Sequence, residues 1–182
     1  IDIDLTKTDA VFQDVQSNMF QNITLVKHFQ YIYEANRTHL TKQCIKEDVL
    51  QMMQLLGLRQ GEHLLERYPF ELSGGMAQRV AFIMSLIRRP DYLFLDEPTS
   101  ALDQGNVKRF MHYLLKAQER YQMTIVFITH DINLVKDFAT HISIMQQGQL
   151  IESGEAASIL TKPIHSYTKK LITIAHRRQL YA

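Results

Sequence analysis

The chain has 182 residues, 46% of them hydrophobic, and a formal net charge of +1. A chain of this length suits about one domain and can bury enough apolar surface to fold without disulfides. The near-neutral charge excludes a broad electrostatic footprint for nucleic acid. The single cysteine, Cys44, excludes an internal disulfide and a cysteine-based metal cage, and we expect it as a small apolar residue on a helix.

The glycine positions exclude a phosphate-binding loop of the usual kind. A P-loop needs two glycines five positions apart, followed by Lys and Ser or Thr. No two glycines of this chain are five positions apart, and no G-x-G pair of the dinucleotide-binding kind occurs. They are Gly57, Gly61, Gly74, Gly75, Gly105, Gly148 and Gly154. Any nucleotide chemistry must therefore do without its usual loop or share one from elsewhere.

The first predicted element is a short apolar strand at residues 10–12, which ends at Gln13. Apolar residues then recur at helical spacing between positions 23 and 36. A second helix is predicted between Thr41 as its N-cap and Gly57 as its end. These patterns predict a small helical region.

After this region the pattern changes to strands that alternate with helices. The expected helices are 74–88, 107–121 and 132–138, and the expected strands are 92–95, 124–128 and a hairpin of 142–145 with 150–151. Short apolar strands alternating with helices indicate an α/β fold with a mostly parallel, covered sheet.

The strongest local motif is the run Leu93–Pro98, in which a buried strand ends in Asp96 and Glu97. Carboxylates at the carboxyl end of a parallel strand face the ligand crevice. Asp96 could orient Mg²⁺, and Glu97 could act as a general base toward water. The alternative is an ordinary acidic turn after a strand.

A second motif is the run Leu72–Arg79, in which Ser73 is a natural N-cap before Gly74 and Gly75. The glycines expose backbone N–H groups at the positive end of a helix dipole, where phosphate binds well. The alternative is a capped helix that follows a flexible turn.

Two further polar residues follow strands. His130, after the strand 124–128, could contact a γ-phosphate, and Gln13 follows the first strand. Taken alone, His130 is better explained as a loop histidine and Gln13 as a polar residue at a strand end.

In their order along the chain, these motifs resemble the nucleotide-binding subunit of ATP-binding cassette (ABC) transporters. Leu72–Arg79 resembles the family's signature motif, Tyr92–Glu97 its Walker B motif and Ser100–Asp103 its D-loop. Gln13 resembles the Q-loop glutamine and His130 the switch histidine.

Two other stretches resemble the oligopeptide, dipeptide and nickel importers of this family. They are Tyr68–Glu71 before the signature and Lys162–Thr168 after the core, where Ser166 replaces a proline of the subfamily's element. The resemblance implies a P-loop NTPase-like ABC ATPase core with an inserted helical subdomain at about 14–72, a catalytic core at 73–161 and a C-terminal extension at 162–182. Walker A would precede Ile1, so the cassette is expected to lack its N-terminal part.

The resemblance also implies site roles with ATP and Mg²⁺ as ligands. Asp96 and Gln13 would position Mg²⁺, Glu97 would activate water, and His130 would hold the γ-phosphate. In a head-to-tail pair of subunits, a second set of residues would face the ATP of the partner or link the two sites. That set is Ser73, Gly74, Gly75, Gln78 and Asp103.

The implied partners are a second ABC ATPase subunit, transmembrane permease subunits and, indirectly, an external substrate-binding protein. Permease contact through the helical region would hold the chain peripherally at the cytoplasmic face of the membrane. The implied function is ATP hydrolysis that drives uptake of peptides or nickel complexes, with no nucleic acid partner. Without Walker A, the 182-residue polypeptide is expected to be inactive alone.

Two other functions remain open at the level of sequence. The first is a non-transport ABC ATPase of DNA repair or translation, although the long coiled coils and paired cassettes of such proteins are absent from this chain. The second is a catalytically inactive remnant, or an interaction module that uses only its signature face.

Overall fold

The computed structural model describes residues 5–36, 40–100 and 102–180. Within it the chain divides into two compact units, Ile1–Ile128 and Thr129–Ala182. This division falls inside the expected catalytic core at 73–161. The subdivision into a helical subdomain, a core and a C-terminal extension therefore stays a prediction, and the two units are described separately.

The first unit contains a three-stranded parallel sheet in the order β1-β2-β3, as the alternating pattern predicts. Its strands are β1 (Thr8–Val11), β2 (Tyr92–Asp96) and β3 (Thr124–Ile128). Val11 pairs with Leu95, which pairs in turn with Phe127. Because all three strands run in one direction, their carboxyl ends meet at the same edge of the sheet.

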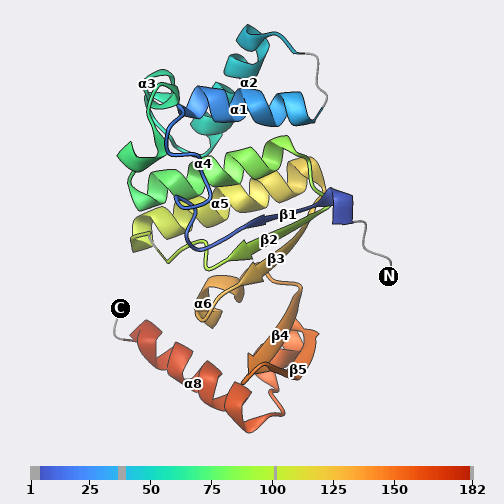
Figure 1. Cartoon of the computed structure of the whole chain (residues 1–182). Coiled ribbons are helices and arrows are strands. Elements are labelled where there is room, and N and C mark those ends of the chain that lie inside the picture. The colour runs from blue at the N-terminus through green and yellow to red at the C-terminus, as the bar shows by residue number, and fades with distance from the viewer. Residues whose placement is uncertain (1–4, 37–39, 101, 181–182) are drawn as a thin grey trace. The chain divides into compact units, whose positions relative to one another are not determined.

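Two long helices lie side by side over the sheet, α4 (Gly74–Ile87) and α5 (Gln104–Tyr121) (Figure 1). Phe82 on α4 packs edge-on against Phe110 on α5, with 5.6 Å between the ring centroids. Both rings are buried, and burial of each contributes about 1.5–3 kcal/mol to stability. Helix α5 follows the loop at the carboxyl end of β2, and α4 follows η2 (Pro69–Glu71), so this packing fixes where the two helices begin relative to each other.

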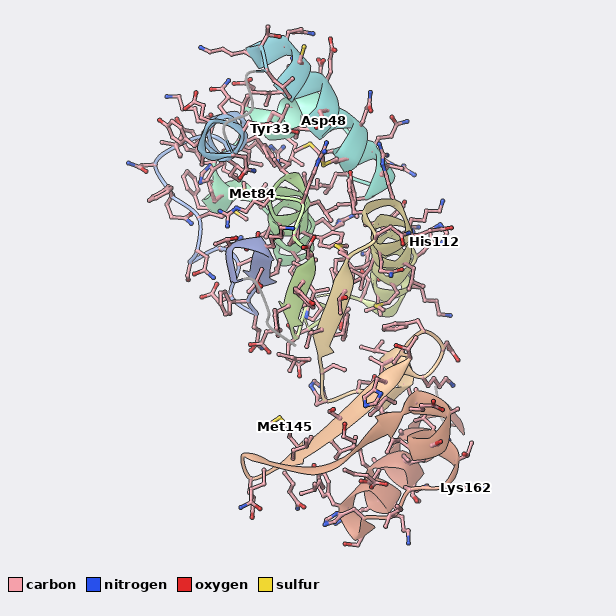
Figure 2. The ribbon with its side chains drawn as sticks, turned by 90° about the vertical axis from the view of Figure 1, so that its right-hand side faces the viewer. Tyr33, Asp48, Met84, His112, Met145 and Lys162 are labelled. Carbon is pink, nitrogen blue, oxygen red and sulfur yellow. The ribbon has the colours of Figure 1, made fainter. Side chains whose placement is uncertain are left out.

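The predicted helical region is present between β1 and α4. It comprises α1 (Leu25–Ala35), α2 (Lys42–Leu55), α3 (Gly61–Leu65) and a 3₁₀ turn, η2 (Pro69–Glu71), directly before α4. Another 3₁₀ turn, η1 (Leu5–Lys7), lies before β1. Thr41 caps α2 as expected, since its side chain accepts a hydrogen bond from the Cys44 backbone N–H. Tyr33 on α1 donates a hydrogen bond to Asp48 on α2, and Figure 2 shows the two side chains together. Burial raises the pKa of the Tyr33 hydroxyl, so this donor stays protonated.

The second unit is built on an antiparallel hairpin, β4 (His141–Gln146) and β5 (Gln149–Glu155). Its turn residues Gln147 and Gly148 have φ values of 50° and 77°, and two positive φ angles suit a tight hairpin turn. Helices α6 (Ile132–Val135), α7 (Ala156–Thr161) and α8 (Ser166–Leu180) complete the unit. Apolar residues of the hairpin, α6, α7 and α8 form its core.

Four local expectations were wrong. The first strand, expected at residues 10–12, is β1 at Thr8–Val11, so Phe12 lies outside it and is exposed. Helix α6 ends at Val135 and not at Phe138, and α5 begins at Gln104 and not at Val107. Cys44 lies on a helix as expected but is exposed, because it occupies the first turn of α2 on its solvent side. Within the described ranges, no helix combines the length and the apolar character needed to cross a bilayer.

Candidate functional site

The carboxyl ends of β1 and β2 bring together three of the predicted site residues. Gln13 follows Val11 by two residues, and Glu97 follows Leu95 by two residues, while Val11 and Leu95 are paired across the sheet. Neighbouring strands lie about 4.8 Å apart, so side chains at corresponding positions can reach a common ligand. Gln13 is exposed, and Asp96 and Glu97 are half-buried, which leaves all three accessible at this edge.

Glu97 sits at a sharp turn held from two sides. Its φ of 48° lies in the left-handed region, which costs a residue with a Cβ about 1–3 kcal/mol. The Glu97 backbone N–H donates to the Ile128 carbonyl at the end of β3, with 3.0 Å between the atoms. Its own carbonyl accepts from the Ser100 backbone N–H at 3.1 Å and from the Ser100 hydroxyl at 2.9 Å. Strained backbone fixed in this way is typical of functional positions.

The N-terminus of α4 presents the second part of the site. Ser73 is the N-cap, and its hydroxyl accepts from the Met76 N–H at 3.4 Å, which is a long bond. Ser73 and Gly74 are exposed. The first N–H groups of a helix have no acceptor within it, so this turn offers donors at the positive end of the dipole.

Gly75 has a packing role that the sequence did not reveal. A Cβ added at this position would lie 2.7 Å from Cδ2 of Leu102, in the segment that leads into α5. The small residue therefore allows the starts of α4 and α5 to approach closely.

Gln78 lies inside the protein and not on the phosphate-facing turn. Its side chain is 2% exposed, and neither its amide nitrogen nor its amide oxygen has a hydrogen-bond partner among the described residues. A direct contact between Gln78 and a nucleotide of another subunit is therefore hard to reconcile with its position. The neighbouring Arg79 is half-buried and donates from Nε to the Gly75 carbonyl at 2.9 Å, and burial lowers the pKa of its guanidinium.

Asp103 has a local partner in the first turn of α5. As the N-cap, its carboxylate accepts from the Asn106 backbone N–H at 3.0 Å and from the Asn106 side-chain amide at 2.6 Å. These bonds hold the pKa of the Asp103 carboxyl below its ordinary value. Of the rest of the predicted D-loop, Ala101 lies outside the described residues.

His130 belongs to the second unit, so it is described apart from Gln13, Asp96 and Glu97. It follows β3 by two residues along the chain and is exposed. The next residue, Asp131, caps α6 by accepting a hydrogen bond from the Asn133 N–H at 3.0 Å.

The donors at the sheet edge fit a magnesium ion that accompanies a nucleotide. Mg²⁺ prefers oxygen ligands and often takes only one or two from the protein, the others coming from water and phosphate. The Asp96 carboxylate at the end of β2 and the Gln13 amide oxygen in the loop after the adjacent β1 are such ligands. The start of α4, where Ser73 and Gly74 are exposed, suits a phosphate group.

Two residues around this site escaped the sequence interpretation. Gln16 donates from Nε2 to the Leu72 carbonyl, 2.8 Å away, which ties the loop after Gln13 to the residue before Ser73. His28 on α1 is buried, and its Nε2 accepts from the Phe20 backbone N–H at 3.0 Å. No sequence pattern signals either bond, because each joins an irregular loop to another segment of the chain.

A parallel sheet with acidic residues at its carboxyl edge, in a chain that also has a glycine-rich helix start, is typical of nucleotide-binding α/β proteins. The sequence model of one family, described as ABC transporter, matches residues 3–100, more than half of the chain. The chain belongs to the ABC transporter family.

The similarity to relatives of this family extends over most of the chain. The dipeptide transport ATP-binding protein DppD of Haemophilus influenzae is 39% identical over 164 residues, which cover 89% of this chain and 49% of the relative. The oligopeptide transport ATP-binding protein OppD of Mycoplasma pneumoniae is 30% identical over 167 residues, which cover 92% of this chain and 39% of the relative. The chain thus spans about half the length, or less, of these relatives.

Solved structures support the fold. The ATP-binding cassette MJ0796, in a dimeric post-hydrolysis state bound to ADP and Pi, aligns with a TM-score of 0.72 and 26% identity, over 82% of this chain and 63% of that one. The protein cbiO1 from Clostridium perfringens, part of the ABC transporter complex cbiONQ, aligns with a TM-score of 0.69 and 27% identity, over 96% of this chain and 68% of that one. The predicted ABC ATPase fold is confirmed.

Proposed function

We propose that this chain is the ATP-binding and ATP-hydrolysing subunit of an ABC importer that takes up peptides. The observation that carries the proposal is the sheet edge at which Asp96 ends β2, while Glu97 and Gln13 follow the paired parallel strands β2 and β1. The names of the two relatives support peptides as the cargo. Neither name mentions nickel, so uptake of nickel complexes rests on the subfamily resemblance alone.

Asp96 and Gln13 hold the magnesium ion in this proposal, and Glu97 polarises the attacking water as a general base. Bound Mg²⁺ supplies neutralisation of charge on the phosphate oxygens. His130 contacts the γ-phosphate and keeps the water in line. The left-handed backbone at Glu97 supports its role, because such strain persists where the surrounding structure and the chemistry require it.

A second ABC ATPase subunit completes each site. Ser73, Gly74 and Gly75 bind the γ-phosphate of ATP held by that subunit, and the exposed, positively polarised start of α4 supports this role. Asp103 lies at the interface between the two sites. We assign Gln78 an indirect role, in which its buried amide influences how α4 is held. The dimeric state of MJ0796 supports pairing, and the partner can be the same chain or a different one.

The permease is the second proposed partner, and a groove in the first unit supports its docking. A cavity of about 510 Å³ opens among β1, the loop after it, α1 and α4. Phe12 and Phe20, with 56% and 70% of their surface exposed, stand on its rim with Tyr31, and Met84 of α4 lies at its wall (Figure 2). Large exposed aromatic side chains beside a groove are typical of a protein interface. Docking there would hold the chain peripherally at the cytoplasmic face of the membrane and connect it indirectly with an external substrate-binding protein.

The division of labour between subunits gives the test. The 182-residue sequence contains no P-loop motif, so the purified chain should hydrolyse ATP negligibly by itself. Addition of a polypeptide that supplies the P-loop of this same cassette should restore hydrolysis, and Glu97→Gln should then abolish it. Turnover by the purified chain alone, lost on Glu97→Gln, would contradict the proposed division.

A further inference from the structure

One side chain connects two parts of the proposed site that are far apart in sequence. Gln16, three residues after Gln13, donates from Nε2 to the Leu72 carbonyl at 2.8 Å. The Pro69 carbonyl lies 3.5 Å from the same nitrogen, at the limit of a hydrogen bond. Gln16 is half-buried, so water competes less for this bond than at an open surface.

The loop that carries Gln16 is tied together by its own polar side chains. The Asp14 carboxylate accepts from the Ser17 N–H and hydroxyl, and the Asn18 amide donates to the Asp14 carbonyl at 3.1 Å. The Gln21 amide donates to the Gln16 carbonyl at 2.6 Å. A segment bonded in this way moves as a unit, so a displacement of Gln13 would reach Gln16.

The acceptor end of the bond lies directly before the N-cap of α4. Leu72 is buried, and its N–H donates to the Pro69 carbonyl at 3.2 Å, which closes η2. The Leu72 carbonyl belongs to the peptide group that joins Leu72 to Ser73. Rotation of this peptide group would reorient Ser73, whose carbonyl accepts from the Met76 and Ala77 N–H groups. The Gln16 bond thus acts on the first turn of α4.

We propose that Gln16 is a positioning residue that couples the loop after Gln13 to the N-terminus of α4. The inference rests on the proposed function, in which Gln13 serves the subunit's own ATP while Ser73–Gly75 contact the ATP of the partner. Gln16 touches neither nucleotide. Through its amide, a displacement of the loop at the subunit's own ATP site reaches the phosphate-binding turn that contacts the ATP of the partner.

Three substitutions at Gln16 separate the hydrogen bond from the size of the side chain. Gln16→Glu keeps the shape but has no N–H to donate, and Gln16→Met removes all polar atoms. Gln16→Lys retains a donor that can reach a carbonyl. Gln21→Met is the matched control, because Gln21 bonds within the loop, to the Gln16 and Met19 carbonyls, and not to Leu72.

Amide hydrogen exchange in the 182-residue chain tests whether the bond holds the helix start. Loss of one net hydrogen bond should speed exchange at Met76 and Ala77 by about 2- to 12-fold in Gln16→Glu and Gln16→Met. In Gln16→Lys and Gln21→Met, the exchange rates of these amides should stay within about twofold of the wild-type rates, which is below the effect expected for a lost hydrogen bond. Unchanged exchange in both donor-free variants would overturn the proposal.

ATP hydrolysis by a transporter assembled from this chain, a polypeptide that supplies the P-loop of its cassette, and the partner subunits tests the coupling. Gln16→Met should lower kcat by about 2- to 30-fold and leave KM for ATP within about twofold, and Gln16→Lys should restore kcat. In a Gln13→Ala background, Gln16→Met should cause no further loss, because the two residues act in series.

Two outcomes of this assay separate the inference from the function on which it rests. Additive losses in the double variant, or an unchanged kcat in an active assembly, would show that Gln16 has only a structural role and would overturn the inference alone. A wild-type assembly without ATP hydrolysis would overturn the proposed function and the inference with it.

Discussion

The buried amide of Gln78 leads to the most informative stability prediction. Its side chain is 2% exposed, and both of its polar atoms lack a hydrogen-bond partner among the described residues. A buried polar group without a partner costs the folded state about 1–3 kcal/mol. Gln78→Met, which keeps an unbranched chain of similar length, should therefore raise the free energy of unfolding by about 1–3 kcal/mol.

Urea unfolding of the 182-residue chain, followed by circular dichroism, measures this change. The midpoint should rise at an unchanged denaturant slope, and Tm should rise by about 2–4 °C for each kcal/mol. Gln118→Met provides the matched control, since Gln118 is exposed on α5 and the same change there should stay within about 0.5 kcal/mol. If Gln78→Met proved no more stabilising than the control, the amide must be hydrogen-bonded in the folded chain and the reasoning fails.

Three further predictions concern elements that position the site. Phe82→Ala should lower the free energy of unfolding by about 3–5 kcal/mol, because it leaves a cavity against Phe110. Urea unfolding measures this loss of stability. A loss below about 1 kcal/mol would refute the packing of the two rings. Burial lowers the pKa of His28 below its ordinary value of 6.5. As the pH falls, His28 therefore becomes protonated in the unfolded chain before it does so in the folded chain. Stability should therefore fall as the pH drops through about 6.5, and thermal unfolding at a series of pH values should show that His28→Gln weakens this dependence. Gly57→Ala should destabilise the chain by about 1 kcal/mol or more in a thermal melt, since Gly57 has a φ of 67° and the Tyr113 hydroxyl lies 3.1 Å from the position of the added Cβ. An unchanged melting temperature would show that the turn relaxes without cost.

Local patterns predicted the parts of the fold that depend on local physics. Thr41 and Ser73 were expected as N-caps, and both accept a hydrogen bond from the first turn of their helix. The strand 124–128 was predicted with its observed bounds, because β-branched and apolar residues fill it. The start of α5 was missed because Gly105 and Asn106 are weak helix formers, and the Asp103 cap compensates for them.

Contacts between distant segments could not be predicted in this way. Gln16 and Leu72 are 56 residues apart, and neither lies in a periodic pattern that would indicate their hydrogen bond. Gln78 follows a glycine-rich helix start whose sequence predicts a phosphate-binding turn, yet its side chain is buried in the protein interior. Periodicity could not reveal this, because α4 is apolar on most of its faces and packs against both α2 and α5.

The residue roles at the sheet edge were assigned by resemblance and remain predictions. The register of β1 and β2 explains why Gln13 can share a ligand with Asp96 and Glu97, which spacing along the sequence could not. Family membership, in contrast, follows from the match over residues 3–100.

ATP hydrolysis by a transporter assembled from this chain, a polypeptide that supplies the P-loop of its cassette, and the partner subunits tests the central claim most directly. The account predicts that Glu97→Gln lowers kcat by at least about 100-fold, because the general base is lost, while the carboxamide still fits the turn. Glu119→Gln, at an exposed position on α5, should hydrolyse ATP like the wild type. Loss of a general base costs at least about 100-fold in rate. A Glu97→Gln assembly whose kcat stays within about twofold of wild type would therefore contradict the claim that this carboxylate activates water.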